Sequence, residues 1–148
     1  EIKDIDGNVV YKNEHKVHNQ LDFPAEQWNV VRQGMRQVVS VHTSSSALIN
    51  QINVAVAGKT GTAEVAGYAK DHWHSWMVAY APYDAPPENQ VVVATLVEAV
   101  NKWEWWAPYA TNIIIQGIFN NQTFEESVDA LKFRYLLNRQ RAAGGRRE

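Results

Sequence analysis

The spacing of apolar and polar positions predicts three strands in the middle of the chain. Residues 54–65 open with small and β-branched apolar residues and predict the first strand, which contains two glycines. Residues from Trp73 to Ala81 alternate as in a second strand. One face would carry His74, Trp76, Val78 and Tyr80, and the other Trp73, Ser75, Met77 and Ala79. Residues 90–98 are almost continuously apolar and predict a third strand, buried on both faces. Because the connections are short, we expect an antiparallel meander over residues 54–98.

A helical period precedes the strands. Pro24 suits the first turn of a helix, and an apolar stripe at helical spacing follows it. The stripe consists of Trp28, Val31, Met35, Val38 and Val39. Gly34 lies inside this helix at a cost of about 1 kcal/mol relative to alanine, so we expect it to pack closely against a neighbour.

Two further helices are predicted after the strands. The first follows Pro108, and the second starts at Thr123, where Glu126 completes the spacing of a capping box. Their apolar stripes are Ala110, Ile113, Ile114, Gly117 and Ile118 in the first, and Phe124, Val128, Leu131 and Tyr135 in the second. These helices would pack on the sheet to form one α+β unit.

The pattern divides the chain into five segments. Asp6-Gly7-Asn8 predicts a hairpin near the N-terminus. The expected segments are 1–22 (hairpin and loop), 23–53 (helix and loop), 54–98 (meander), 107–141 (C-terminal helices) and 142–148 (tail).

The composition adds to this picture only by limiting the kinds of partner that we expect. The chain has 148 residues, a net charge of -2 and no cysteine. We therefore expect no nucleic acid or anionic membrane as its main partner, no disulfide and no thiolate metal site. No apolar run approaches the roughly 20 residues of a membrane span, and the first residues do not have the pattern of a signal peptide.

The candidate chemistry lies in Gly58-Lys59-Thr60-Gly61-Thr62, inside the first predicted strand. A lysine ammonium and two threonine hydroxyls can hold an anionic group by charge and hydrogen bonds. Glycines in a strand indicate that another backbone or a ligand approaches closely. Lys-Thr-Gly alone is a short motif that recurs by chance. The residues on either side of it therefore determine how specific it is.

With these flanks the chain resembles the transpeptidase domain of class B penicillin-binding proteins, in particular the elongation type. The resemblance covers about residues 1–120 and departs mildly at Met77 and Ala79, where the family often has an aromatic residue and a glycine. Four segments carry it in the family's order: Trp28-x-x-Val31-x-x-Gly34-Met35-x-x-Val38-Val39, Ala57 to Glu64, His74 to Pro82, and Val91 to Glu98 followed by Ala107-Pro108-Tyr109-Ala110.

Two of the family's three catalytic motifs are not found in this sequence. Acyl-enzyme chemistry in the family uses Ser-x-x-Lys, Ser-x-Asn and Lys-Thr-Gly. No serine here has a lysine three positions later or an asparagine two positions later; the serines are Ser40, Ser44, Ser45, Ser46, Ser75 and Ser127. The chain therefore resembles the C-terminal half of a transpeptidase domain, and we expect it to be inactive alone.

The resemblance implies roles for four residues. Lys59 would direct positive charge toward the substrate carboxylate, and the hydroxyls of Thr60 and Thr62 would contact that carboxylate. The backbone N–H of Thr62 would be one of two oxyanion donors. Gly61, without a Cβ, would let the substrate peptide and the rest of the domain approach the strand.

The implied function is D,D-transpeptidation at the outer face of the bacterial cytoplasmic membrane, in peptidoglycan synthesis. The implied partners are the nucleophile-bearing N-terminal half of the domain, the peptidoglycan stem peptide, β-lactams and proteins of the elongation complex. No cofactor is expected, and the membrane would be reached only through an N-terminal anchor outside this sequence.

Several alternatives stay open. The chain could be a non-catalytic module that binds a cell-wall partner, or a relative of β-lactamases and β-lactam sensors, which share Lys-Thr-Gly. His72 and His74 have the spacing of metal ligands on a strand, although structural roles are far more common. The Trp103–Trp106 loop is either an aromatic wall beside the site, a partner surface or simple packing. The C-terminal arginines could contact lipid headgroups or a partner, but a solvated tail is the favoured interpretation; they are Arg139, Arg141, Arg146 and Arg147.

Overall fold

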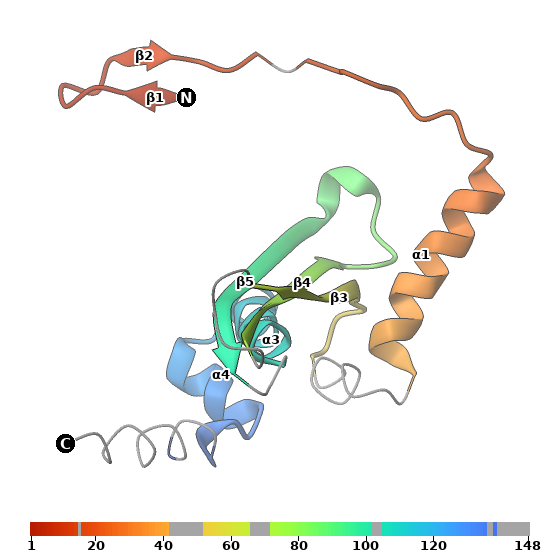
Figure 1. The fold of residues 1–148 in the computed structure, drawn as a ribbon, viewed down its shortest axis with the longest axis vertical. Coiled ribbons are helices and arrows are strands. Elements are labelled where there is room, and N and C mark those ends of the chain that lie inside the picture. The colour runs from red at the N-terminus through yellow and green to blue at the C-terminus, as the bar shows by residue number, and fades with distance from the viewer. Residues whose placement is uncertain (15, 42–51, 66–71, 102–104, 136–137, 139–148) are drawn as a thin grey trace.

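The computed structural model describes residues 1–14, 16–41, 52–65, 72–101, 105–135 and 138. Several predicted features lie outside these residues, namely the loop at residues 43–46, Trp103 and Glu104, and the 142–148 tail. The described part is an α+β fold, as predicted, with helices packed on an antiparallel sheet (Figure 1).

The central sheet has three antiparallel strands in the order β3-β4-β5. They are β3 (Ala57–Glu64), β4 (His72–Ala81) and β5 (Val91–Asn101), so the predicted meander is confirmed. The 3-10 turn Pro87–Asn89 connects β4 to β5. Because β4 lies in the middle, its two neighbours fix its register along most of its length. The register shifts between Trp73 and Ser75, where the β4–β5 ladder contains an irregularity.

The two faces that the alternation predicts for β4 differ in burial. Ser75, Met77 and Ala79 are fully buried on one face, called here the inner face. Trp76 and Val78 are 38% and 39% exposed on the other, called here the outer face.

Helix α3 (Trp106–Asn120) packs on the inner face of the sheet. Its residues Ala107 and Ile115 join Met77 in the main core. The Thr111 hydroxyl donates a hydrogen bond of 2.8 Å to the Thr95 hydroxyl on β5. Figure 1 shows α3 lying behind the strands. The helix is thus attached to the sheet by both apolar contacts and polar ones.

The prediction that β5 is buried on both faces is wrong. Val92 is 68% exposed and Leu96 is 39% exposed, although both belong to the apolar run. Leu96 is the register partner of Trp76, which places it on the outer face. In the described part of the chain, helices α3 and α1 contribute to the core on the inner face, and no element contributes a comparable layer to the outer face. A continuous apolar run does not by itself tell how many faces are covered.

Helix α1 (Ala25–Ser40) begins directly after Pro24 and runs beside β3 (Figure 1). Only its last turn enters the core, through Val39. Arg36 donates to the carbonyl oxygen of Val56 at 3.0 Å, and Arg32 donates to that of Tyr83 at 3.0 Å. These bonds attach the helix to the residue before β3 and to the turn after β4.

Most of the predicted stripe of α1 is not buried. Trp28 and Val31 are 42% and 54% exposed. A Cβ added at Gly34 would meet no atom within 4 Å. The prediction that Gly34 packs closely against a neighbour is therefore wrong for the described chain, since the helix approaches the sheet only near its C-terminal end.

The N-terminal hairpin consists of β1 (Ile2–Lys3) and β2 (Val9–Tyr11), paired antiparallel. Gly7 has a φ of 85°, which a glycine adopts without strain. Asp4 accepts backbone bonds from Asp6 and Asn8. Figure 1 shows the hairpin and the segment after it extending away from the sheet.

Helix α4 (Phe124–Ala130) follows α3 and carries the predicted capping box. Thr123 accepts from the Glu126 N–H, and the Glu126 carboxylate accepts from the Thr123 N–H. Tyr109, Val128, Leu131 and Phe133 form a second buried cluster, called here the α3–α4 cluster. Trp105 and Trp106 pack against it. For these two tryptophans the structure favours the packing interpretation of the loop.

Alkaline pH is expected to loosen the α3–α4 cluster through Tyr109. Burial raises the pKa of Tyr109 to about 12, and the Tyr135 hydroxyl adds to the shift. In the unfolded chain the tyrosine pKa is about 10, so the folded state holds this proton more tightly. The stabilisation is complete below that pH and is lost as the pH rises through the folded pKa.

Urea unfolding at a series of pH values measures this effect. Between about pH 10 and pH 12 the stability of the wild type should fall more steeply than that of Tyr109→Phe. Tyr11→Phe, in the exposed hairpin, should follow the wild type. Parallel curves for the wild type and Tyr109→Phe would contradict the prediction.

Candidate functional site

The candidate site lies on β3, an edge strand among the described strands. β4 pairs with β3 on one side, and the other side faces no described strand. Lys59 and Thr62 are exposed, and Thr60 and Gly61 are half-buried. The strand thus brings all four predicted site residues to one free edge.

The register places these residues on alternate faces. Lys59 pairs with Val78, so its side chain belongs to the outer face. Thr60 and Thr62 pair with Met77 and Ser75, which belong to the inner face. A ligand that contacts the ammonium and the hydroxyls together must therefore lie along the edge of β3, where both faces meet.

The Lys59 ammonium has a local partner. Its Nζ donates a hydrogen bond of 2.7 Å to the Thr60 carbonyl oxygen. Within the described residues, no carboxylate is close enough to form an ion pair with it. The charge is therefore not neutralised by a described carboxylate and can attract an anion.

Gly58 and Gly61 allow β4 to approach β3 closely. A Cβ at Gly58 would lie 2.6 Å from Met77 Cε and 2.8 Å from the Val78 carbonyl oxygen. A Cβ at Gly61 would lie 3.3 Å from Trp76 Cβ. The expectation of a close backbone is thus met at Gly58, where the backbone is that of β4.

Sequence reasoning missed the role of Ser75 as a link between the sheet and α3. Its hydroxyl is fully buried and accepts a hydrogen bond of 3.0 Å from the Ala107 N–H. Ser75 is also the register partner of Thr62. The signal in the sequence was a hydroxyl on the buried face of an otherwise apolar strand.

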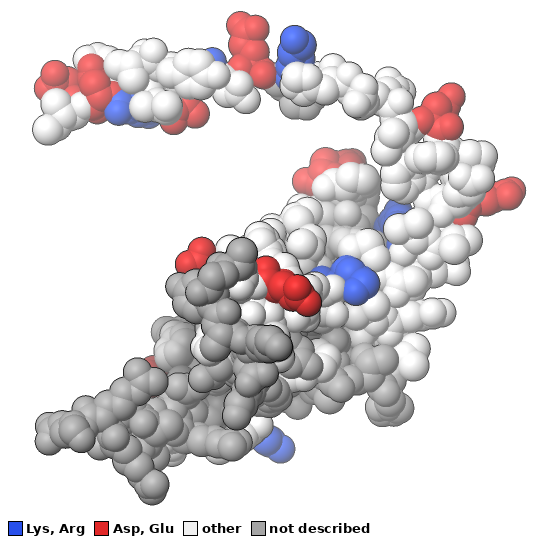
Figure 2. All heavy atoms as spheres, viewed as in Figure 1, with Lys and Arg blue, Asp and Glu red and all other residues white. Residues whose placement is uncertain are grey.

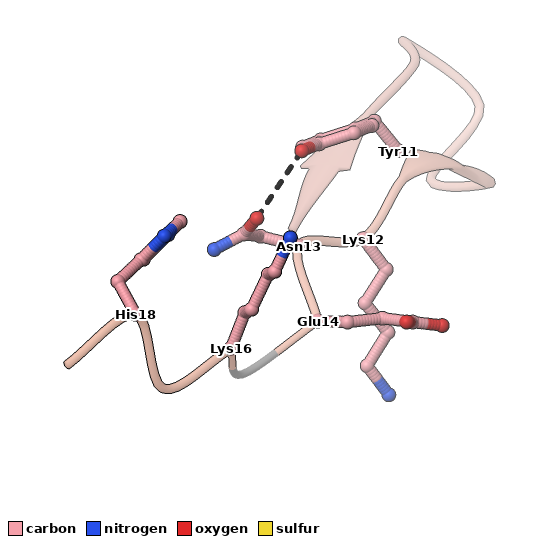
Figure 3. Close-up of a pocket in the computed structure, with 6 residues that line it drawn as sticks. All are labelled: Tyr11, Lys12, Asn13, Glu14, Lys16 and His18. Atoms are coloured by element: carbon pink, nitrogen blue, oxygen red, sulfur yellow. Dashed lines mark hydrogen bonds between the residues drawn. The ribbon is translucent and has the colours of Figure 1, made fainter. Parts of the chain in front are cut away.

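Two hollows of the described surface lie away from β3. One, of about 690 Å³, is lined by residues of the segment after β2 (Figure 3): Tyr11, Lys12, Asn13, Glu14, Lys16 and His18. In it the Tyr11 hydroxyl donates to Asn13 at 3.2 Å. The other, of about 200 Å³, is apolar and lies at the start of α1, between Phe23, Trp28 and Val31. Neither of these two hollows is lined by a residue of β3.

Charge and metal ligands add little to the site. On the face drawn in Figure 2, acidic and basic side chains are scattered, without a continuous patch of one sign over the described residues. His72 and His74 both lie on β4 and are half-buried. Within the described residues, no three histidine, aspartate or glutamate side chains come together as a metal site would require.

An antiparallel sheet packed by helices, with Lys-Thr-Gly on an edge strand, is the arrangement expected of a transpeptidase domain. The family model of the penicillin-binding protein transpeptidase domain matches residues 1–121. The chain therefore belongs to this family, whose domains bind penicillin, cross-link peptidoglycan and are extracytoplasmic. A search of the curated proteins gave no match. None of the helices in the described residues has both the length and the apolar character of a membrane span.

Proposed function

We propose that this chain is the Lys-Thr-Gly half of a peptidoglycan D,D-transpeptidase of class B, elongation type. The observation that carries the proposal is the edge of β3 that pairs with no described strand and presents the Lys59 charge and the Thr60 and Thr62 hydroxyls together. A peptide ending in D-alanine can add to such an edge as a further strand, with its carboxylate near the ammonium.

Each site residue has a distinct role in this proposal. Lys59 attracts the terminal carboxylate of the substrate, and the hydroxyls of Thr60 and Thr62 donate hydrogen bonds to it. The Thr62 N–H donates to the oxyanion that forms when a serine attacks the peptide carbonyl. Gly61, which has no Cβ, lets the substrate backbone approach the strand. Lys59 and Thr62 are therefore the catalytic candidates.

The serine nucleophile comes from a partner segment with Ser-x-x-Lys and Ser-x-Asn. The outer face of the sheet supports such a partner, because Trp76, Val78 and Leu96 are each more than a third exposed there. Exposed apolar patches of this kind mark interaction surfaces. The stem peptide, β-lactams and elongation-complex proteins are the further partners, on the outer side of the cytoplasmic membrane.

Mass spectrometry after penicillin treatment tests the proposal. The chain alone should show no covalent adduct, because none of its six serines has the nucleophile's motif. The protein translated from the intact gene, with its upstream sequence, should gain the mass of one penicillin on a serine outside these residues. An adduct on the isolated chain, or none on the whole protein, would overturn the proposal.

A non-catalytic binding module is the second candidate, favoured by the same exposed outer face. In that case the isolated chain should be monodisperse and should bind a protein of the division or elongation complex. Aggregation that is relieved by the Ser-x-x-Lys segment would instead support the transpeptidase half.

A further inference from the structure

The N-terminus of α3 lacks a side-chain cap of its own. The residue before the helix, Trp105, makes no side-chain capping bond. The first helical bond runs from the Tyr109 N–H to the Trp105 carbonyl oxygen, at 3.1 Å. The N–H groups of a first turn have no partner within the helix, and Pro108 has no N–H. The buried Ala107 N–H therefore needs an acceptor from elsewhere.

Ser75 supplies this acceptor from the sheet. Its hydroxyl oxygen lies 3.0 Å from the Ala107 nitrogen, and both residues are fully buried. The bond joins residues 32 positions apart in the chain. Ser75 thus caps α3 from β4, as an N-cap serine does from within its own helix.

The same residue lies beside an irregularity of the sheet. The β4–β5 register shifts between Trp73 and Ser75, so the ladder is interrupted beside Ser75. Across the other ladder Ser75 pairs with Thr62. Because β4 is the described neighbour of β3, the position of the Thr62 backbone depends on β4 at this point. The bond to α3 is a further attachment of β4 at this irregularity.

We infer that Ser75 is a positioning residue for the Lys59–Thr62 edge. By fixing β4 opposite Thr62 to the N-terminus of α3, it holds the Thr62 N–H where an oxyanion forms. This inference rests on the proposed acyl-transfer function, since it concerns the same site. Ser75 does not itself touch the substrate.

The chain offers a matched control in Thr111. Its hydroxyl also joins α3 to the sheet, at 2.8 Å from Thr95, and Thr111 is also fully buried. This bond is four residues further along α3 and ends on β5, which is not a neighbour of β3. Ser75→Ala and Thr111→Val therefore each remove one bond between α3 and the sheet, but only the first lies beside Thr62.

The test measures acylation by a fluorescent penicillin in the protein translated from the intact gene. Stopped-flow traces give the limiting acylation rate and the half-saturating concentration, and thermal unfolding gives the stability of each variant. A displaced group in an active site costs about 100-fold when it moves by 1 Å, so a smaller displacement in Ser75→Ala should cost about tenfold. The limiting rate should fall while the half-saturating concentration stays unchanged.

Thr111→Val should be destabilised to a similar degree and keep a limiting rate within about twofold of the wild type. Ser75→Thr, which keeps the hydroxyl, should recover most of the lost rate. If Ser75→Ala does not fold, Ser75→Cys takes its place, because a thiol is only a weak acceptor.

Equal losses in the Ser75 and Thr111 variants, or no loss in either, would overturn the role of Ser75 and leave the proposed function intact. A wild-type protein that is not acylated at all would overturn the proposed function and this role with it. The two failures are distinguished by the wild-type trace alone.

Discussion

Replacing Lys59 with glutamine should slow acylation by penicillin about 100-fold or more. The proposed function assigns this ammonium to the carboxylate that positions the reacting carbonyl, and single groups that stabilise developing charge contribute factors of 100 to 1,000, about 3 to 4 kcal/mol. The assay is the same stopped-flow acylation in the protein translated from the intact gene.

Replacing Lys59 should leave the stability of the fold nearly unchanged. Lys59 is exposed, and its bond to the Thr60 carbonyl is a surface one, so unfolding should change by less than about 0.5 kcal/mol. Lys59→Arg keeps the charge but not the shape of the ammonium, and should retain more activity than Lys59→Gln. An acylation rate in Lys59→Gln within threefold of the wild type, by contrast, is incompatible with the role we assign.

Alanine at Gly58 should destabilise the chain by about 3 kcal/mol, since overpacking a well-packed position costs up to that much. The new Cβ would lie 2.6 Å from Met77 Cε and 2.8 Å from the Val78 carbonyl oxygen. The methionine end can move, but the carbonyl belongs to the backbone of β4. Relief therefore requires that β3 and β4 separate. Urea unfolding of the chain measures the loss.

Gly34→Ala is the matched control for Gly58→Ala. The same methyl group meets no atom within 4 Å at Gly34, and it removes a glycine from a helix interior. It should therefore raise the free energy of unfolding by about 0.5 to 1 kcal/mol. If both substitutions change the free energy of unfolding in the same direction, the space around each glycine does not determine the effect of the added methyl group.

The elements with a clear period could be predicted from the sequence. The alternation in β4 predicted that Ser75, Met77 and Ala79 share one face, and the spacing of Thr123 and Glu126 identified the start of α4. Both signals are local, because they depend on residues only two or three positions apart. The site motif was recognised by the same kind of local evidence, although its roles are still proposals.

Errors arose where the answer depends on distant parts of the molecule. The apolar run of β5 predicted two covered faces, but whether a face is covered depends on other elements, and Val92 and Leu96 are exposed. The glycine at position 34 predicted a close neighbour that α1 does not have. Ser75 was not singled out because its role requires the register of β4 and the position of α3 together.

The α3–α4 cluster extends the packed core beyond the residues that the family model matches. The family match stops at residue 121, directly after α3, yet Val128, Leu131 and Phe133 lie buried beyond that point. The ring of Phe133 meets Tyr109 edge-on, with the ring centres 4.6 Å apart. A chain that ended at residue 121 would lack Val128, Leu131 and Phe133. The side of α3 that carries Tyr109 would then be exposed to solvent, and α3 is the helix that Ser75 caps. The packed core therefore extends further along the chain than the sequence match to the family does.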